Sequence, residues 1–266
     1  MKTILTTLIL VGIIGFSYGQ TDYKVIKVNG SITMKSSGKN LSTGTVFSDR
    51  ENLLFGQPTA KAAVINPEKG RFVVTPENAN DLTNSKSNFI PGLSNISSRS
   101  GASSLRNIVD MKNYFSGNFM IFDSTTIVIN SPDFPIDENN FFYCRYKYND
   151  EDVNKKLEYL GDTVIIYKNE LLSILGNPIS SEDVTEMQLF YYQQNEKKSV
   201  LINSFNPVFA EKSLKEEIQV IIDELSSKTF KEKYDAIVSY LNEFYGKPDE
   251  SNLKNWLKTE FNLEQK

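Results

Sequence analysis

Aromatic side chains are the residues of this chain best suited to bind a partner. They concentrate in two short runs, 141–148 and 190–192. Successive side chains of a strand point to opposite faces, so each run places rings on both sides of a sheet. One side must be core, and the other is either covered by further elements or forms an exposed platform for a glycan or a protein, where Tyr is favoured. The candidates for partner contact are Phe141, Tyr143, Tyr146, Tyr148, Tyr191 and Tyr192.

Two acidic segments, 131–140 and 149–152, could gather oxygen ligands around Ca²⁺. Neither has the residue order of an EF-hand loop. We therefore interpret 131–140 as a solvated, Pro-shaped hairpin loop and 149–152 as the start of a helix, where negative charge is favoured. No metal ligand and no cofactor is predicted.

Catalytic groups are scarce in this sequence. The chain has no histidine, which excludes Ser-His-Asp and Cys-His enzymes. Its one cysteine, Cys144, lies in a strand-like alternation and is expected to be a small buried hydrophobe rather than a nucleophile. Neither a phosphate-binding G-x-x-x-x-G-K-[ST] loop nor a G-x-S-x-G motif occurs. We predict no catalytic residue and no enzyme activity.

Carboxylate pairs keep one enzymatic alternative open. Glycoside hydrolysis needs two carboxylates ~5 to 10 Å apart across a cleft. Asp49 with Glu51, and Glu182 with Asp183, are available but lie in turn-like surroundings. The alternative function is a glycan-binding protein or a carboxylate-based hydrolase with its site in the second domain.

The charge balance limits the partners. Lys and Arg number 29 against 33 Asp and Glu, which gives a net charge of -4. A chain without a basic field is not expected to bind nucleic acid or anionic lipid.

The first nineteen residues predict a secretory signal peptide. Lys2 precedes an apolar run over 4–16, and Ser17-Tyr18-Gly19 is a cleavage signal ahead of Gln20. Thirteen apolar residues extend ~20 Å as a helix, short of the ~30 Å hydrocarbon core. No cysteine follows the cleavage region to carry a lipid. We expect a protein of the periplasm or the extracellular space, soluble rather than lipid-anchored, without membrane insertion after cleavage.

The mature chain is expected to contain a small all-β domain over 20–77, a Ser/Asn-rich linker over 78–104 and a second domain that begins near Leu105. Residues 23–76 predict about six short strands and no helix. Asn29-Gly30 and the Pro/Gly loop at 66–70 each favour a hairpin.

Residues 105–210 predict an α+β domain around an antiparallel sheet. Strands over 118–122 and 126–130 should pair with each other, and 152–159 should form a short helix. Residues 211–266 have helical spacing, with capping boxes at Ser213/Glu216 and Thr229/Glu232. This helical subdomain is expected to pack on 105–210, so the fold class is α+β.

The N-terminal β-domain carries strand and turn motifs at 25–30, 41–44, 53–55, 62–65 and 70–72. These motifs resemble those of the FecR-like periplasmic β-domain. They follow in the same order: alternating valines with a Gly, then L-x-x-G, then a hydrophobic strand, and finally an Ala/Val strand before a Gly turn. The resemblance covers about a fifth of the chain and implies a binding or signal-relay role in which the domain meets an outer-membrane partner. Together with the predicted export, it favours a non-enzymatic envelope protein, a scaffold or signalling accessory, that contacts an unidentified envelope protein.

Overall fold

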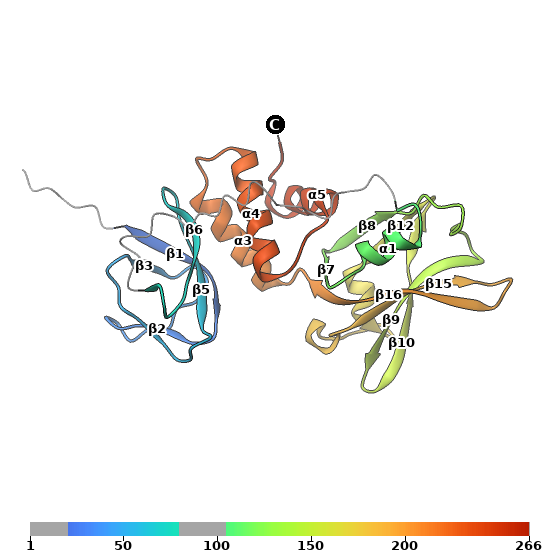
Figure 1. Ribbon diagram of the computed structural model, residues 1–266, viewed down its shortest axis with the longest axis horizontal. Coiled ribbons are helices and arrows are strands. Elements are labelled where there is room, and N and C mark those ends of the chain that lie inside the picture. Colours follow the sequence, from blue (N-terminus) through green and yellow to red (C-terminus); the bar gives the residue numbers. More distant parts are fainter. Residues whose placement is uncertain (1–20, 80–104, 266) are drawn as a thin grey trace, which may run out of the picture.

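The computed structural model describes residues 21–79 and 105–265 of the chain (Figure 1). The predicted signal peptide, and all of the predicted linker except residues 78 and 79, lie outside the described residues. The fold is α+β, as predicted, with antiparallel sheets in the N-terminal region, a mixed sheet in the second domain and helices at the C-terminus.

Six short strands form the N-terminal β-domain, in agreement with the prediction. They are β1 (Asp22–Asn29), β2 (Ile32–Met34), β3 (Val46–Ser48), β4 (Leu53–Phe55), β5 (Lys61–Asn66) and β6 (Gly70–Val74). Four of them make an antiparallel sheet in the order β3-β1-β5-β6, and β2 pairs with β4. The core between these two sheets includes Tyr23, Val64 and Phe72.

One of the two predicted hairpins in this domain is present. Strands β5 and β6 are joined through 66–70, where Asn66 Oδ1 accepts the N–H groups of Glu68 and Lys69 and Gly70 has φ 82°. The hairpin predicted at Asn29-Gly30 is wrong. Strand β1 pairs with β3 over Asp22–Lys24 and with β5 over Lys24–Asn29, and β2 pairs with β4 rather than with β1.

The second domain contains two sheets and short helices. Its elements are α1 (Ile108–Tyr114), β7 (Asn118–Ile121), β8 (Ser124–Val128), β9 (Asn140–Tyr148), β10 (Glu151–Lys156), β11 (Glu158–Leu160), β12 (Thr163–Tyr167), α2 (Lys168–Leu171), β13 (Ser173–Ile174), β14 (Asn177–Pro178), a 3₁₀ turn (Ser181–Asp183), β15 (Met187–Gln193) and β16 (Lys198–Phe209). The larger sheet has the order β10-β9-β15-β16-β7, and the smaller has the order β11-β12-β8.

Two predictions for this domain are wrong. Strands β7 and β8 do not pair: β7 lies parallel to β16, β8 pairs with β12, and between them Phe122 packs on Trp256. Residues 152–159 form β10 and the start of β11 rather than a helix. The cause is the turn before them, where Asn149 and Asp150 have φ values of 50° and 65° and send the chain back along β9 as a two-residue hairpin.

Three helices follow the sheets: α3 (Lys212–Glu224), α4 (Phe230–Phe244) and α5 (Glu250–Phe261). The Thr229/Glu232 capping box at the start of α4 is confirmed, with reciprocal side-chain bonds to the two backbone N–H groups. The box predicted at Ser213/Glu216 is wrong, because α3 begins two residues earlier than that box requires and its N-cap, Glu211, makes no side-chain cap bond. None of the helices in the described residues is long and apolar enough to cross a bilayer.

The C-terminal helices lie between the N-terminal β-domain and the second domain (Figure 1). The sequence predicts packing on 105–210, and α5 meets that region at β8, where the Asn252 side chain accepts the Thr126 N–H and donates to the Thr126 carbonyl. Helix α3 instead packs on β1 and β5, and the apolar side chains Ile26, Ala63 and Ile65 join the helical core. A bulge in β1 between Val25 and Lys27 brings Ile26 and Lys27 to the same side of the sheet, where Ile26 joins the helical core and Lys27 meets Glu217 of α3.

A buried polar cluster fastens α3 and α4 to the N-terminal sheet. We call Lys27, Glu217, Tyr240 and Tyr245 the Glu217 cluster. Glu217 is 3% exposed, and its Oε1 lies 3.0 Å from Lys27 Nζ. Its Oε2 accepts the hydroxyl protons of Tyr240 and Tyr245, and Lys27 Nζ lies 4.5 Å from the centre of the Tyr245 ring. Burial and the neighbouring Glu217 carboxylate raise the pKa of both tyrosines.

Candidate partner-binding face

Strands β9 and β15 run antiparallel in the middle of the larger sheet and carry both aromatic runs. Phe141 pairs with Tyr192, Tyr143 with Phe190, and Arg145 with Gln188. Directly opposed residues project to the same side of a sheet, so these three pairs share one face. The alternate residues of both strands form the other face.

The inner face of these strands belongs to the core. Phe142, Cys144, Tyr146, Leu189 and Tyr191 are all buried there. The Tyr146 hydroxyl donates to the Leu171 carbonyl at 2.5 Å, and the Tyr191 hydroxyl donates to the Pro135 carbonyl at 2.6 Å. Burial raises the pKa of each of these tyrosines to about 12.

The six aromatic candidates therefore divide into two sets. Tyr146 and Tyr191 are 3% and 1% exposed, and half-buried Tyr148 packs against the same core, so none of the three faces a partner. The reason is the two-residue period of the strand, which alternates these positions with the outward ones. Phe141, Tyr143 and Tyr192 lie together on the opposite side.

We call the opposite side the outer aromatic face and define it by Phe141, Tyr143, Phe190, Tyr192, Arg145 and Lys156. Phe190, Arg145 and Lys156 are absent from the predicted set. Phe190 and Arg145 could have been predicted from the alternation of the strands, because each lies two residues from a candidate on that side. Lys156, on β10, belongs to this face because it pairs with Tyr143 on β9. A helix was predicted over 152–159, so this pairing was not expected.

Ring geometry determines what this face presents to solvent. The Tyr143 and Phe190 rings stack with centroids 5.1 Å apart and planes 8° apart, and Phe141 lies 5.2 Å from Tyr192. The Tyr143 and Phe190 rings therefore cover one flat face of each other, whereas the Phe141 and Tyr192 planes are tilted by 43° and do not stack.

Two cations lie over rings of this face. The Arg145 guanidinium carbon lies 4.8 Å from the Phe190 centroid, and Lys156 Nζ lies 4.3 Å from that of Phe141. Arg145 Nε donates to Asn154 Oδ1 at 2.8 Å, which fixes the guanidinium in place. Within the described residues, neither cation has a carboxylate within ion-pair distance.

The helices pack on other surfaces of the molecule. Helix α3 lies on β1 and β5, α5 meets β8, and α1 contacts β16 from the core side, where Met111 and Phe115 are buried. Phe141, Phe190 and Tyr192 remain half-buried, and Leu201, which pairs with Phe190, is 44% exposed at the edge of the face. Tyr143 is only 8% exposed, and its hydroxyl donates to Ser199 Oγ at 3.1 Å, so this candidate is buried between its neighbours. On the described part of the chain, the open portion of the outer aromatic face consists of Phe141, Phe190, Tyr192, Arg145 and Lys156.

Cys144 lies in the core of the second domain. Its side chain is fully buried, as predicted, and burial raises the pKa of its thiol to about 12. A thiol in this environment stays protonated and does not act as a nucleophile.

The two acidic segments serve turns in the structure. Asp137 Oδ1 accepts bonds from the Asn140 amide and the backbone N–H groups of Asn139 and Asn140, and these bonds lower the pKa of Asp137. Segment 149–152 forms the turn between β9 and β10 and the first residues of β10 rather than the start of a helix. No group of three or more metal-ligating side chains occurs in residues 21–79 and 105–265.

The available carboxylate pairs lie away from any catalytic setting. Glu51 accepts the N–H and the hydroxyl of Ser36, which lowers the pKa of Glu51, and Glu182 and Asp183 are exposed in the 3₁₀ turn. Glu51 holds a turn, Glu182 and Asp183 face solvent, and Asp49 has its Oδ1 buried without a hydrogen-bond partner among the described residues. A general acid in a glycosidase instead needs an apolar pocket that keeps it protonated.

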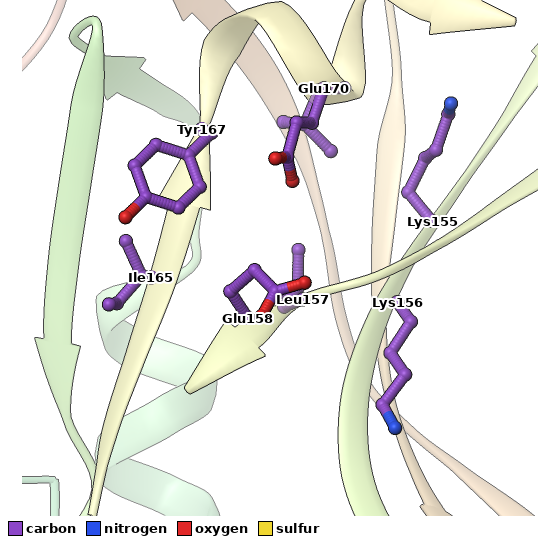
Figure 2. A pocket seen from close by; sticks show the side chains of 8 residues that line it. Lys155, Lys156, Leu157, Glu158, Ile165, Tyr167 and Glu170 are labelled. Carbon is purple, nitrogen blue, oxygen red and sulfur yellow. The ribbon is translucent and has the colours of Figure 1, made fainter. Parts of the chain in front are cut away.

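A small hollow lies between β10, β11 and the β12–α2 connection (Figure 2). Its volume is about 180 Å³, enough for about six water molecules at ~30 Å³ each and below the ~300 Å³ of small ligand pockets. Glu158 and Glu170 are both exposed at its rim, and Lys155 is held by the Ser173 carbonyl. The polar and apolar side chains that line it include Lys155, Lys156, Glu158, Ile165, Tyr167 and Glu170.

No protein-family model matches the chain, and no curated protein matches it. The outer aromatic face is therefore interpreted from its own geometry.

Proposed function

We propose that this chain is an exported, non-enzymatic protein of the cell envelope that acts through protein–protein contacts made by the outer aromatic face. The single observation that carries the proposal is an open sheet face on which three half-buried rings, supported by the buried Tyr143, and two cations are ordered before any partner binds. Tyr, Phe and Arg are the residue types enriched where proteins meet.

The ring geometry favours a protein over a glycan as the partner. Sugars bind on the flat faces of aromatic rings, and here the Tyr143–Phe190 stack, Arg145 and Lys156 occupy faces of Tyr143, Phe190 and Phe141. The rings, the cations and the exposed Leu201 side chain offer the mixed apolar and charged contacts typical of a protein interface.

The N-terminal β-domain has a separate place in the proposal. Its resemblance to FecR-like domains and its predicted export support a role as a binding or relay module at the envelope. The Glu217 cluster supports mechanical coupling of this domain to the helices. In the proposed function, the second domain contacts the partner and the N-terminal β-domain is held at a fixed position relative to that contact.

Site-directed crosslinking tests the proposed contact. A photoreactive side chain replaces Tyr192 on the outer aromatic face or, as a matched control, Leu175, which is 97% exposed on the β13–β14 hairpin. We expect a discrete protein adduct from envelope fractions at position 192 and none at 175, and we expect Phe190→Ala to weaken it. Equal adducts at both positions, or a glycan ligand whose binding depends on Phe190, would reject the proposal.

Cell fractionation tests export independently. We expect the mature protein outside the cytoplasm with Gln20 as its first residue, determined by N-terminal sequencing. A cytoplasmic protein that retains residues 1–19 would contradict this part of the proposal.

A further inference from the structure

The two cations of the outer aromatic face have unused binding capacity. Arg145 donates through Nε to Asn154, and its two terminal nitrogens have no partner among the described residues. Lys156 contacts the Phe141 ring and is exposed. A guanidinium fixed at Nε presents its terminal N–H pair in the geometry that binds a carboxylate through two parallel hydrogen bonds.

The charge of this face is opposite to that of the chain. The protein has a net charge of -4, yet Arg145 and Lys156 lie together without a carboxylate. The third cation on this side, Lys147, differs from them because Asp152 lies 3.4 Å from its Nζ. The two unpaired cations favour a negatively charged partner.

The register of β9 and β10 fixes the separation of the strand positions that carry the two cations. Arg145 pairs with Asn154, and Lys156 pairs with Tyr143 two residues along each strand, so Arg145 and Lys156 are diagonal neighbours on one face. Diagonal neighbours in an antiparallel pair lie about 7–8 Å apart. In an extended peptide, side chains two residues apart lie on the same side at about 7 Å. The two spacings match.

We propose that the outer aromatic face binds an acidic segment of a partner protein in extended conformation, whose carboxylates on alternate residues pair with Arg145 and Lys156. The apolar side chains of that segment contact the rings and Leu201. This inference rests on the proposed function, and it adds the chemistry and the spacing of the partner.

Labelled peptides test the inference with the mature chain and fluorescence anisotropy. The first peptide carries two Glu residues at alternate positions in a Thr/Val background. The second has the same composition with the Glu residues adjacent, and the third has Lys in place of Glu. We expect only the first to bind, with affinity that falls as salt rises.

Neutral variants identify the cations involved. We expect Arg145→Gln and Lys156→Gln each to weaken binding of the first peptide by about tenfold, the effect of one charge-assisted hydrogen bond. Lys147→Gln is the matched control, since Lys147 already has Asp152, and it should leave binding unchanged. All three positions lie at or near the surface, and circular dichroism verifies that each variant folds.

Several results would overturn the inference. It is wrong if the adjacent-Glu or the Lys peptide binds as tightly as the first, or if no peptide binds. It is also wrong if polygalacturonate, an acidic polysaccharide, binds through Arg145 and Lys156 in place of the peptide, or if the chain forms a dimer that these two variants dissociate.

The proposed function and this inference fail in different ways. If Phe190→Ala abolishes the crosslink at position 192 and the two cation variants leave it intact, the partner contact stands and the acidic segment is wrong. If neither kind of variant changes the crosslink, the proposed function itself is wrong.

Discussion

The Glu217 cluster and the outer aromatic face each place a cation over an aromatic ring, and they differ in whether a carboxylate completes the site. In the Glu217 cluster, Lys27 lies over Tyr245 and pairs with a carboxylate that is itself buried. On the outer aromatic face, Arg145 and Lys156 lie over rings with no carboxylate among the described residues. In the first site the cation pairs with a carboxylate of the same chain, whereas the cations of the second site have hydrogen-bond donors available to another molecule.

The comparison also separates stability from binding. A buried ion pair that loses one partner leaves an uncompensated charge out of water, so its removal destabilises the fold strongly. A partly exposed cation over a ring contributes about 0.5–1 kcal/mol. Substitutions in the Glu217 cluster should therefore act on the free energy of unfolding, and those on the outer aromatic face should act on partner affinity.

The largest effect is expected from Glu217→Ala. It leaves Lys27 without its carboxylate and two buried tyrosine hydroxyls without their acceptor, and should lower the free energy of unfolding by about 3 kcal/mol. Urea denaturation measures the change. Glu216→Ala is the control, because Glu216 is exposed on the same helix and pairs only with Lys212 at 3.7 Å, and it should change stability by less than about 0.5 kcal/mol. Equal effects of the two substitutions would show that the buried cluster contributes nothing special.

A pH effect of intermediate size should come from the same cluster. The pKa values of Tyr240 and Tyr245 are raised in the fold, so both hydroxyls keep their protons when the unfolded chain begins to lose its own near pH ~10. The unfolded state then binds fewer protons than the folded state, and stability falls as pH rises above ~10, by about 1.4 kcal/mol per pH unit for each retained proton. Below that pH, these two groups add no pH dependence.

Tyr245→Phe tests the assignment of this slope. We expect the variant to lose stability less steeply above pH ~10 than the parent chain, because one retained proton is gone. Denaturation midpoints across the alkaline range give the slopes. An unchanged slope would place the alkaline sensitivity elsewhere in the molecule.

The smallest stability effect is expected when the outer aromatic face receives its own carboxylate. Gln188 pairs directly with Arg145, so Gln188→Glu supplies the missing charge within the chain. We expect a gain of about 0.5 kcal/mol in stability from the new cross-strand pair. We also expect weaker binding of the alternate-Glu peptide, because Arg145 is then occupied.

Gln188→Asn leaves Arg145 without a carboxylate and is the control for Gln188→Glu. If Gln188→Glu instead strengthened binding of the acidic peptide, Arg145 would not be the group that receives its carboxylate. The contrast between the two cation sites would then lose its functional meaning.

Local sequence patterns predicted much of the fold. The six strands between Asp22 and Val74, the β5–β6 hairpin and the Thr229/Glu232 capping box follow from turn residues and short-range side-chain bonds. Long-range pairings did not follow: β1 pairs with β3 and β5 rather than with its neighbour β2, and β7 lies parallel to a strand more than eighty residues further on. Nothing near those strands in the sequence encodes these choices.

The candidate site was predictable only in part, for a related reason. Alternation within each strand brings Phe141 and Tyr143 to one side, but which side faces the core depends on where α1 and the smaller sheet pack. Lys156 depends on the β9–β10 hairpin, whose signal is the Asn149-Asp150 pair with its positive φ values. An Asn-Asp pair between two apolar runs predicts a hairpin more strongly than a helix start when the following residues continue to alternate.

The contact between β1 and α3 also determines the order in which the molecule can be completed. Lys27 and Glu217 are 190 residues apart, so the side of the first sheet that carries Ile26, Ala63 and Ile65 stays uncovered until the last fifty-odd residues have been synthesised. Contacts of such long sequence separation form slowly, because the whole intervening chain must be closed into a loop. The nascent chain therefore exposes an aggregation-prone apolar surface in its N-terminal region for most of its synthesis. We expect it to need a chaperone during that interval.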